Sequence, residues 1–157
     1  MSNGPGGAGG AGAAGPGIRG IHHLGIVVRD ARAAAERFAR LGLEVAAWEE
    51  YGPGLLRIGF IPVGDVLLEL IEPLGTDDFN ARWLQERGEG VQHVAFQVDD
   101  LPAALAWLRA RGVPLQDERP RPGAADTLIA FLAPDAADGL LVELTQPLGP
   151  WPWTRRP

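Results

Sequence analysis

The sequence predicts an α+β fold made of two tandem βαβββ modules. Residues 20–45 align with residues 90–115 without a gap, and the two segments share seven identical residues, among them a histidine, an aspartate and a glycine. A second match pairs GDVLLELIEPLG (64–75) with DGLLVELTQPLG (138–149). Such internal similarity indicates a duplicated structural unit, and each copy contains strand-like and helix-like segments in the same order.

The first module, residues 20–75, opens with an apolar run that is typical of a strand. Asp30 follows it as a good helix N-cap, and an Ala-rich helix is expected from there to Gly42, where a left-handed C-cap would end it. Turns that contain glycine then separate three extended segments, which are expected at 43–50, 54–62 and 65–72.

The second module, residues 90–149, repeats this order. Asp100 and Pro102 begin the helix and Gly112 ends it, and strands are expected near 113–117, 126–133 and 139–146. Between the modules, GTDDFNARWLQERGEG is interpreted as a short connecting helix.

The remaining segments and the composition limit the class of protein. We expect a disordered Gly/Ala-rich leader at 1–17, one domain at 18–148 and a Pro/Trp-rich tail at 150–157. No signal peptide or membrane-spanning run is found, so a cytoplasmic location is expected. The net charge of −6 argues against nucleic acid or an anionic membrane as partner. Without cysteine, any metal must be held by nitrogen and oxygen donors.

Strand alternation then brings four polar side chains together. His23 recurs as His93, and Glu69 recurs as Glu143, each within an apolar strand. A glutamate in such a strand is costly to bury unless it is paired or bound to a cation. Two histidines and two glutamates on matching faces therefore predict a site for one divalent ion. Co, Mn, Ni, Zn and Fe all fit these donors, whereas His22 is expected on the opposite face of its strand.

These positions resemble those of the vicinal-oxygen-chelate superfamily, which includes glyoxalase I, extradiol dioxygenases and bleomycin resistance proteins. Within it, LLELIEPLG, ARWLQERGEGVQHVAFQVDD and GLLVEL are most similar to methylmalonyl-CoA epimerases. The resemblance covers nearly all of residues 20–146. It implies a cupped, barrel-like mixed sheet, a homodimer, and a metal held by His23, Glu69, His93 and Glu143.

The resemblance also implies an activity: epimerisation of a 2-methyl-branched acyl-CoA through a metal-stabilised enolate. Glu143 would be the base that removes the α-proton, and Glu69 the second catalytic carboxylate. The family's separate glutamate in the third strand is absent, and Arg57 lies close to its expected place. Arg57, Arg119 and Arg121 are candidates for binding substrate, because arginine binds phosphate well.

Three other functions stay open. A glyoxalase-I-like isomerase would use Glu69 and Glu143 as opposed carboxylates, and the missing third-strand glutamate favours it. A drug- or metabolite-binding protein without catalysis is disfavoured by the complete set of four ligands. An iron dioxygenase needs only two histidines and one glutamate.

Overall fold

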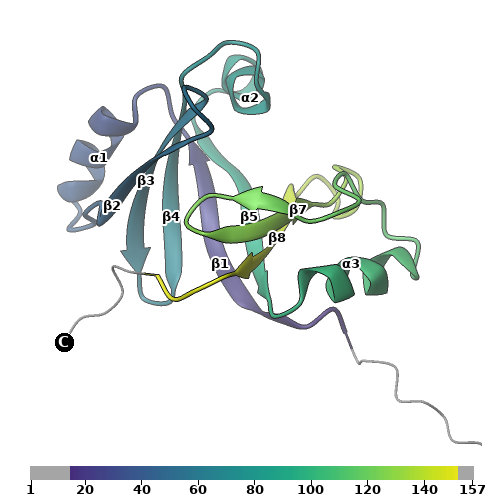
Figure 1. Ribbon diagram of the computed structural model, residues 1–157. Coiled ribbons are helices and arrows are strands. Elements are labelled where there is room, and N and C mark those ends of the chain that lie inside the picture. The colour runs from purple at the N-terminus through teal and green to yellow at the C-terminus, as the bar shows by residue number, and fades with distance from the viewer. Residues whose placement is uncertain (1–14, 152–157) are drawn as a thin grey trace, which may run out of the picture.

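The computed structural model describes residues 15–151 of the 157-residue chain. Within them, one eight-stranded mixed sheet curls into a half-barrel, and three helices accompany it (Figure 1). The elements are, in order, β1 (Ile18–Val27), α1 (Ala31–Ala39), β2 (Ala47–Tyr51), β3 (Leu56–Val63), β4 (Val66–Pro73), α2 (Phe79–Arg87), β5 (Gly90–Val98), α3 (Leu101–Arg109), β6 (Arg121–Gly123), β7 (Thr127–Phe131) and β8 (Val142–Pro147). The predicted α+β class and the two βαβββ modules are confirmed.

The order of strands shows how the two modules meet. It runs β2-β3-β4-β1-β5-β8-β7-β6, so that each half repeats the arrangement of the other. β1 pairs antiparallel with β5 at the centre, while β4 and β8 run parallel to β1 and β5. The first strands of both modules are therefore neighbours, and their polar residues lie close together.

Local sequence signals account for the two equivalent helices. Asp30 and Asp100 each accept a hydrogen bond from the backbone N–H three residues further on, at 2.9 Å, as N-cap residues do. The predicted N-caps are confirmed. Gly42 and Gly112 have the predicted left-handed conformation, with φ angles of 79° and 71°, which glycine adopts without strain. The helices end earlier than predicted, at Ala39 and Arg109, and Arg40 and Ala110 occupy the C-cap positions.

Helices α1 and α3 pack against the outer face of the sheet and do not cover its inner face. On α1, Ala31 and Ala34 pack against Ile61 and Leu70. On α3, four buried residues pack against the corresponding face of the second module, namely Leu101, Ala104, Leu105 and Leu108. Because alternate residues of a strand face opposite ways, the neighbours of these contact positions face the inside of the half-barrel.

The strand predicted near 113–117 is wrong. An isolated bridge joins Leu115 to Leu132, and the first short strand after α3 is β6, at Arg121–Gly123. Prolines at positions 114, 120 and 122 explain the difference, because proline has no N–H to donate to a neighbouring strand. The last strand also begins later than predicted, since Asp138 and Gly139 turn the chain with φ angles of 50° and 91°.

Several predictions concern the ends of the chain and the surroundings of the protein. Residues 1–14 of the expected leader and 152–157 of the tail lie outside the described part. Trp151, within it, packs edge-on against His22 with ring centroids 4.8 Å apart. None of the helices in residues 15–151 has the length and apolarity needed to cross a membrane. The homodimer and the cytoplasmic location stay predictions.

Candidate metal centre

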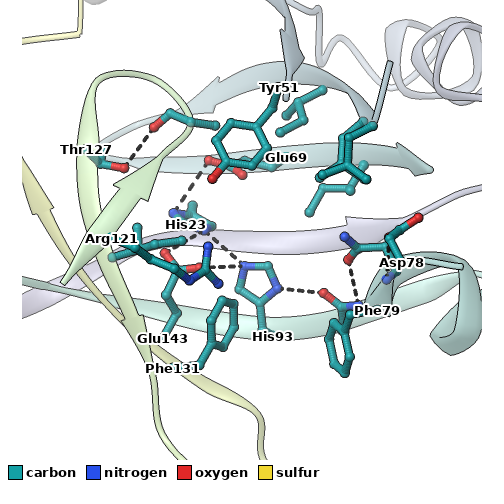
Figure 2. A pocket seen from close by; sticks show the side chains of 18 residues that line it. His23, Tyr51, Glu69, Asp78, Phe79, His93, Arg121, Thr127, Phe131 and Glu143 are labelled. Atoms are coloured by element: carbon teal, nitrogen blue, oxygen red, sulfur yellow. Dashed lines mark hydrogen bonds and ion pairs between the residues drawn. The ribbon is translucent and has the colours of Figure 1, made fainter. Parts of the chain in front are cut away.

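The four predicted ligands lie together on the four central strands. His23 is on β1, Glu69 on β4, His93 on β5 and Glu143 on β8, and each exposes at most 5% of its surface. Figure 2 shows all four side chains directed towards one another inside the half-barrel. The repeat therefore does bring the duplicated histidine and glutamate of each module to one place.

Three of these side chains converge on a common point. The Nε2 atoms of His23 and His93 are 3.1 Å apart. The two carboxylate oxygens of Glu143 each lie 3.6 Å from one of these nitrogens. One donor atom from each residue falls within 4.8 Å of the others. Two imidazole nitrogens and a carboxylate, all buried, are a donor set that suits Zn, Co, Ni, Mn or Fe, so the residues present fit a divalent ion.

Glu69 approaches from a different side. Its Oε1 lies 3.6 Å from Nδ1 of His23, on the opposite edge of the ring from Nε2. Glu69 is consequently outside the three-donor group, and its role as a fourth ligand stays a prediction. The imidazole of His23 is thus flanked by two buried carboxylates, one from each module.

In each module, the residue before the histidine lies within hydrogen-bond distance of that histidine's Nδ1 atom. Nδ1 of His22 is 2.8 Å from Nδ1 of His23, and Oε1 of Gln92 is 3.0 Å from Nδ1 of His93. A histidine that binds metal through Nε2 carries its proton on Nδ1, and a hydrogen bond from Nδ1–H fixes this tautomer. Gln92 is in turn held by Asn80, whose Oδ1 accepts from its Nε2 at 2.9 Å.

The expectation that His22 lies apart from His23 on the opposite face is therefore wrong. β1 shifts its register against β5 between Ile21 and His23, which breaks the strict alternation on which that expectation depended. The sequence contains a signal for the contacts of His22 with His23 and of Gln92 with His93. In both modules, a residue able to accept a hydrogen bond comes directly before the repeated histidine.

Gly25 is a further residue that sequence reasoning missed. It lies directly opposite His93 across β1 and β5. A Cβ at position 25 would be 2.0 Å from Cε1 of His93, so the ring occupies the space that any other side chain would need. Glycine inside a strand often marks such a close approach.

Burial shifts the pKa values of all these groups towards their neutral forms. It raises the pKa of Glu143 to about 7, although the Thr145 hydroxyl, which donates to Oε1 at 2.5 Å, opposes the shift. Burial, and then the neighbouring Glu143 and Glu49, raise the pKa of Glu69 well above its usual range. Burial lowers the pKa of His93 to about 4 and that of His23 well below its usual value. The histidines are thus neutral, as metal ligands must be.

A cavity of about 230 Å³ opens onto this cluster. Of the three arginines predicted to bind substrate, Arg121 lines it, with its guanidinium 5.6 Å from the centre of the Phe131 ring and an ion pair to Asp117 at 3.2 Å. Arg119 is absent from the lining. Arg57 lies on the opposite face of β3, where it pairs with Glu72 at 3.2 Å, so neither contacts the cavity wall.

The edge strands of the two modules meet beside the cavity. The Tyr51 hydroxyl on β2 donates to the Pro122 carbonyl on β6 at 2.7 Å, and Glu49 accepts from the backbone N–H of Ala125 at 2.8 Å. Tyr51 also lines the cavity. These contacts join β2, at one end of the sheet order, to β6 and to the turn between β6 and β7, at the other end.

Comparison with known families agrees with this geometry. Residues 22–131 match the glyoxalase/bleomycin resistance protein/dioxygenase superfamily. Among curated proteins, the chain is 38% identical to the uncharacterised protein YqjC of Bacillus subtilis, over 82% of this chain and 93% of that protein. It is 33% identical to the ethylmalonyl-CoA/methylmalonyl-CoA epimerase of Cereibacter sphaeroides, over 80% and 96% of the two chains.

Solved structures include close neighbours. The methylmalonyl-CoA epimerase of Mycobacterium tuberculosis superposes with a TM-score of 0.81 and 32% identity, covering 89% of this chain and 95% of that one. A methylmalonyl-CoA epimerase in complex with methylmalonyl-CoA and NH4+ superposes with a TM-score of 0.78 and 32% identity, covering 84% and 96%.

Proposed function

Because the chain belongs to the glyoxalase/bleomycin resistance protein/dioxygenase superfamily, we propose that it is a metal-dependent epimerase of a 2-methyl-branched acyl-CoA. The likeness to methylmalonyl-CoA epimerases, at 32% and 33% identity, supports the substrate class. The observation that carries the reaction type is the pair of buried carboxylates, Glu69 and Glu143, on opposite edges of one imidazole.

His23, His93 and Glu143 would hold the metal. A divalent ion bound there supplies a Lewis acid, which withdraws electron density from a substrate carbonyl and so acidifies the adjacent C–H. The protein's own contribution is to keep both imidazoles neutral and oriented, through burial and through His22 and Gln92.

Inversion of a carbon centre needs a proton acceptor on one face and a proton donor on the other. Glu143 in its ionised form takes the α-proton from one epimer, and Glu69, whose pKa burial raises well above its usual range, returns a proton on the opposite face. For the other epimer the roles are exchanged: ionised Glu69 takes the α-proton and protonated Glu143 returns one. No co-reactant is consumed. Glu69 lies outside the three-donor group and approaches His23 from the other edge of its ring.

Arg121 supplies positive charge to the cavity, beside Glu143. Its guanidinium is suited to a carboxylate, which it binds through two parallel hydrogen bonds. We assign it to the free carboxylate of the acyl group.

The test is α-proton exchange on methylmalonyl-CoA in heavy water, measured together with inversion, on protein reloaded with Co, Mn, Ni or Zn. Glu69→Gln should keep exchange and lose inversion, because one face loses its proton carrier. Glu143→Gln should lose both by about 10²–10⁴-fold, the usual contribution of a general base. The exposed Glu50→Gln on β2 is the matched control.

Absence of exchange from protein with a verified metal content would contradict the proposal. The glutathione hemithioacetal of methylglyoxal would then be the next substrate, because two opposed carboxylates also suit an isomerase of that kind. Equal loss of exchange and inversion in Glu69→Gln would contradict the separate roles of the two glutamates.

A further inference from the structure

The segment that follows β8 lies at one end of the half-barrel. In Figure 1 it runs from the end of β8 towards the ends of β3 and β4. Residues 149–151 line a hollow of about 480 Å³ there, together with Gly64 and Asp65 in the turn between β3 and β4. His22 lines the same hollow, so this segment reaches the neighbour of a proposed metal ligand. The reaction proposed above makes no use of it.

His22 has one ring nitrogen that lacks a conventional hydrogen bond. The residue exposes 2% of its surface. Its Nδ1 lies 2.8 Å from Nδ1 of His23, whereas its Nε2 is buried and has no hydrogen-bond partner within residues 15–151. Burying a polar atom in this way costs free energy unless another interaction compensates it.

The contact with His23 decides which nitrogen of His22 carries the proton. Two Nδ1 atoms at 2.8 Å require that one donates and the other accepts. When His23 binds a metal through Nε2, its own proton is on Nδ1, so Nδ1 of His22 must be the acceptor. The proton of His22 is then on Nε2. The atom without a partner is therefore an N–H donor that needs an acceptor.

Trp151 is the aromatic residue that packs on this imidazole. Its ring centroid is 4.8 Å from that of His22, and the two ring planes are 78° apart. Such an edge-to-face arrangement suits an N–H that donates to the face of an aromatic ring, since the face carries partial negative charge. Trp151 also packs against the core cluster that contains Val27 and Leu67, so the body of the protein holds it in place.

We propose that Trp151 is a positioning residue of the metal centre. Its ring face accepts the Nε2–H of His22 and so fixes the tautomer in which His22 accepts from His23. This inference rests on the metal centre of the proposed function. A tryptophan beyond the last strand thus orients a metal ligand through two imidazoles in series, which we call the Trp151 relay.

The tautomer of His22 also affects Glu69. Oε1 of Glu69 lies 3.6 Å from Nδ1 of His23, which is beyond hydrogen-bond distance. If His22 carried its proton on Nδ1, two N–H groups would face each other, and His23 would turn its donor towards Glu69. The Trp151 relay keeps that donor on His22 and away from the carboxylate assigned to the second face of the substrate.

The first experiment is long-range ¹H–¹⁵N NMR of the full, zinc-loaded chain with labelled histidine. The chain has three histidines, and a His22→Gln protein identifies the signals of His22. We expect the Nε2–H tautomer for His22 and the Nδ1–H tautomer for His23 and His93. The Nε2 proton of His22 should be shifted upfield, because it lies over an aromatic face.

Variants at position 151 test the source of that shift. Trp151→Leu should abolish it and speed the exchange of the Nε2 proton with water. Trp151→Phe keeps an aromatic face and should retain both properties. Trp107→Leu is the matched control, because it removes another half-buried tryptophan, on α3, and it should leave the signals of His22 unchanged.

The second experiment is a double-mutant cycle on zinc affinity, measured by competition titration. Trp151→Leu should weaken binding by about two- to fivefold, the effect of one weak hydrogen bond of this kind, and Trp151→Phe should restore it. In a His22→Leu background, Trp151→Leu should cause no further loss, because the relay is already interrupted. Equal losses in both backgrounds would show that Trp151 acts independently of His22 and would overturn the proposal.

The remaining outcomes separate the Trp151 relay from the reaction. An Nδ1–H tautomer of His22 in the zinc-loaded wild type would overturn the relay, as would a signal that Trp151→Leu leaves unchanged. Protein that takes up no zinc would overturn the relay together with the metal centre. Neither experiment uses an acyl-CoA, so both expected results would support the relay even without α-proton exchange. Exchange by a protein whose His22 carries its proton on Nδ1 would support the epimerase and refute the relay.

Discussion

Replacing Thr145 with valine should weaken divalent-metal binding by about ten- to a hundredfold at pH 7. The Thr145 hydroxyl is fully buried and donates to Oε1 of Glu143 at 2.5 Å. Valine has nearly the same shape but no donor. A hydrogen bond to a charged group contributes about 1.5–3 kcal/mol, and about 1.4 kcal/mol corresponds to a factor of ten in affinity. Without it, the pKa of Glu143 rises further above its usual range, and protons compete more strongly with the metal.

Competition titration with Zn or Co at pH 7 and pH 9 measures this effect. Thr145→Ser keeps a hydroxyl and should restore most of the affinity, and the exposed Thr76→Val should bind like the wild type. The deficit of Thr145→Val should shrink at pH 9, where Glu143 is ionised in both proteins. Equal affinity of Thr145→Val and wild type at pH 7 would refute the reasoning, and so would a deficit that Thr145→Ser does not relieve.

Three further predictions concern the same site. Gly25→Ala should displace the His93 ring, because its new Cβ would lie 2.0 Å from Cε1, and metal content after dialysis should fall to that of a His93→Ala protein. His22→Leu and Gln92→Leu should each weaken metal affinity about 10–100-fold and change the visible spectrum of the Co(II) form, because each removes the partner of a ligand's Nδ1. Metal affinity should decline as the pH falls below about 7, because the raised pKa of Glu143 means that its carboxyl must lose a proton before it can bind. Titration in buffers of different ionisation enthalpy should then detect proton release at pH 6 and none at pH 8.5.

Much of the fold could be predicted because its causes are local or repeated. Asp30 marks the start of a helix and Gly42 turns the chain shortly after its end, through a hydrogen bond and a φ angle within a few residues. The strand near 113–117 could not be placed, because prolines on either side allow several extended conformations, and pairing with β7 decides among them.

The same division applies to the site. Duplication indicated which histidine and glutamate of each module belong to the site. Burying the same polar side chains in both modules costs free energy unless they are paired or bind a ligand. Their arrangement depended on the register between β1 and β5, which places Gly25 under His93 and brings His22 to His23.

By itself, then, the sequence determined the two modules, their helix starts and the four buried polar residues. Helix caps and strand periodicity depend on residues close together in the chain, and the repeat is found by comparing the two halves of the sequence. Only the tertiary structure decided that His23, His93 and Glu143 converge within 4.8 Å while Glu69 lies on the other edge of the His23 ring. It also decided that Arg121 enters the cavity while Arg57 faces away from it. Distances between strands far apart in the chain follow from sheet register, bulges and curvature, which no local pattern specifies.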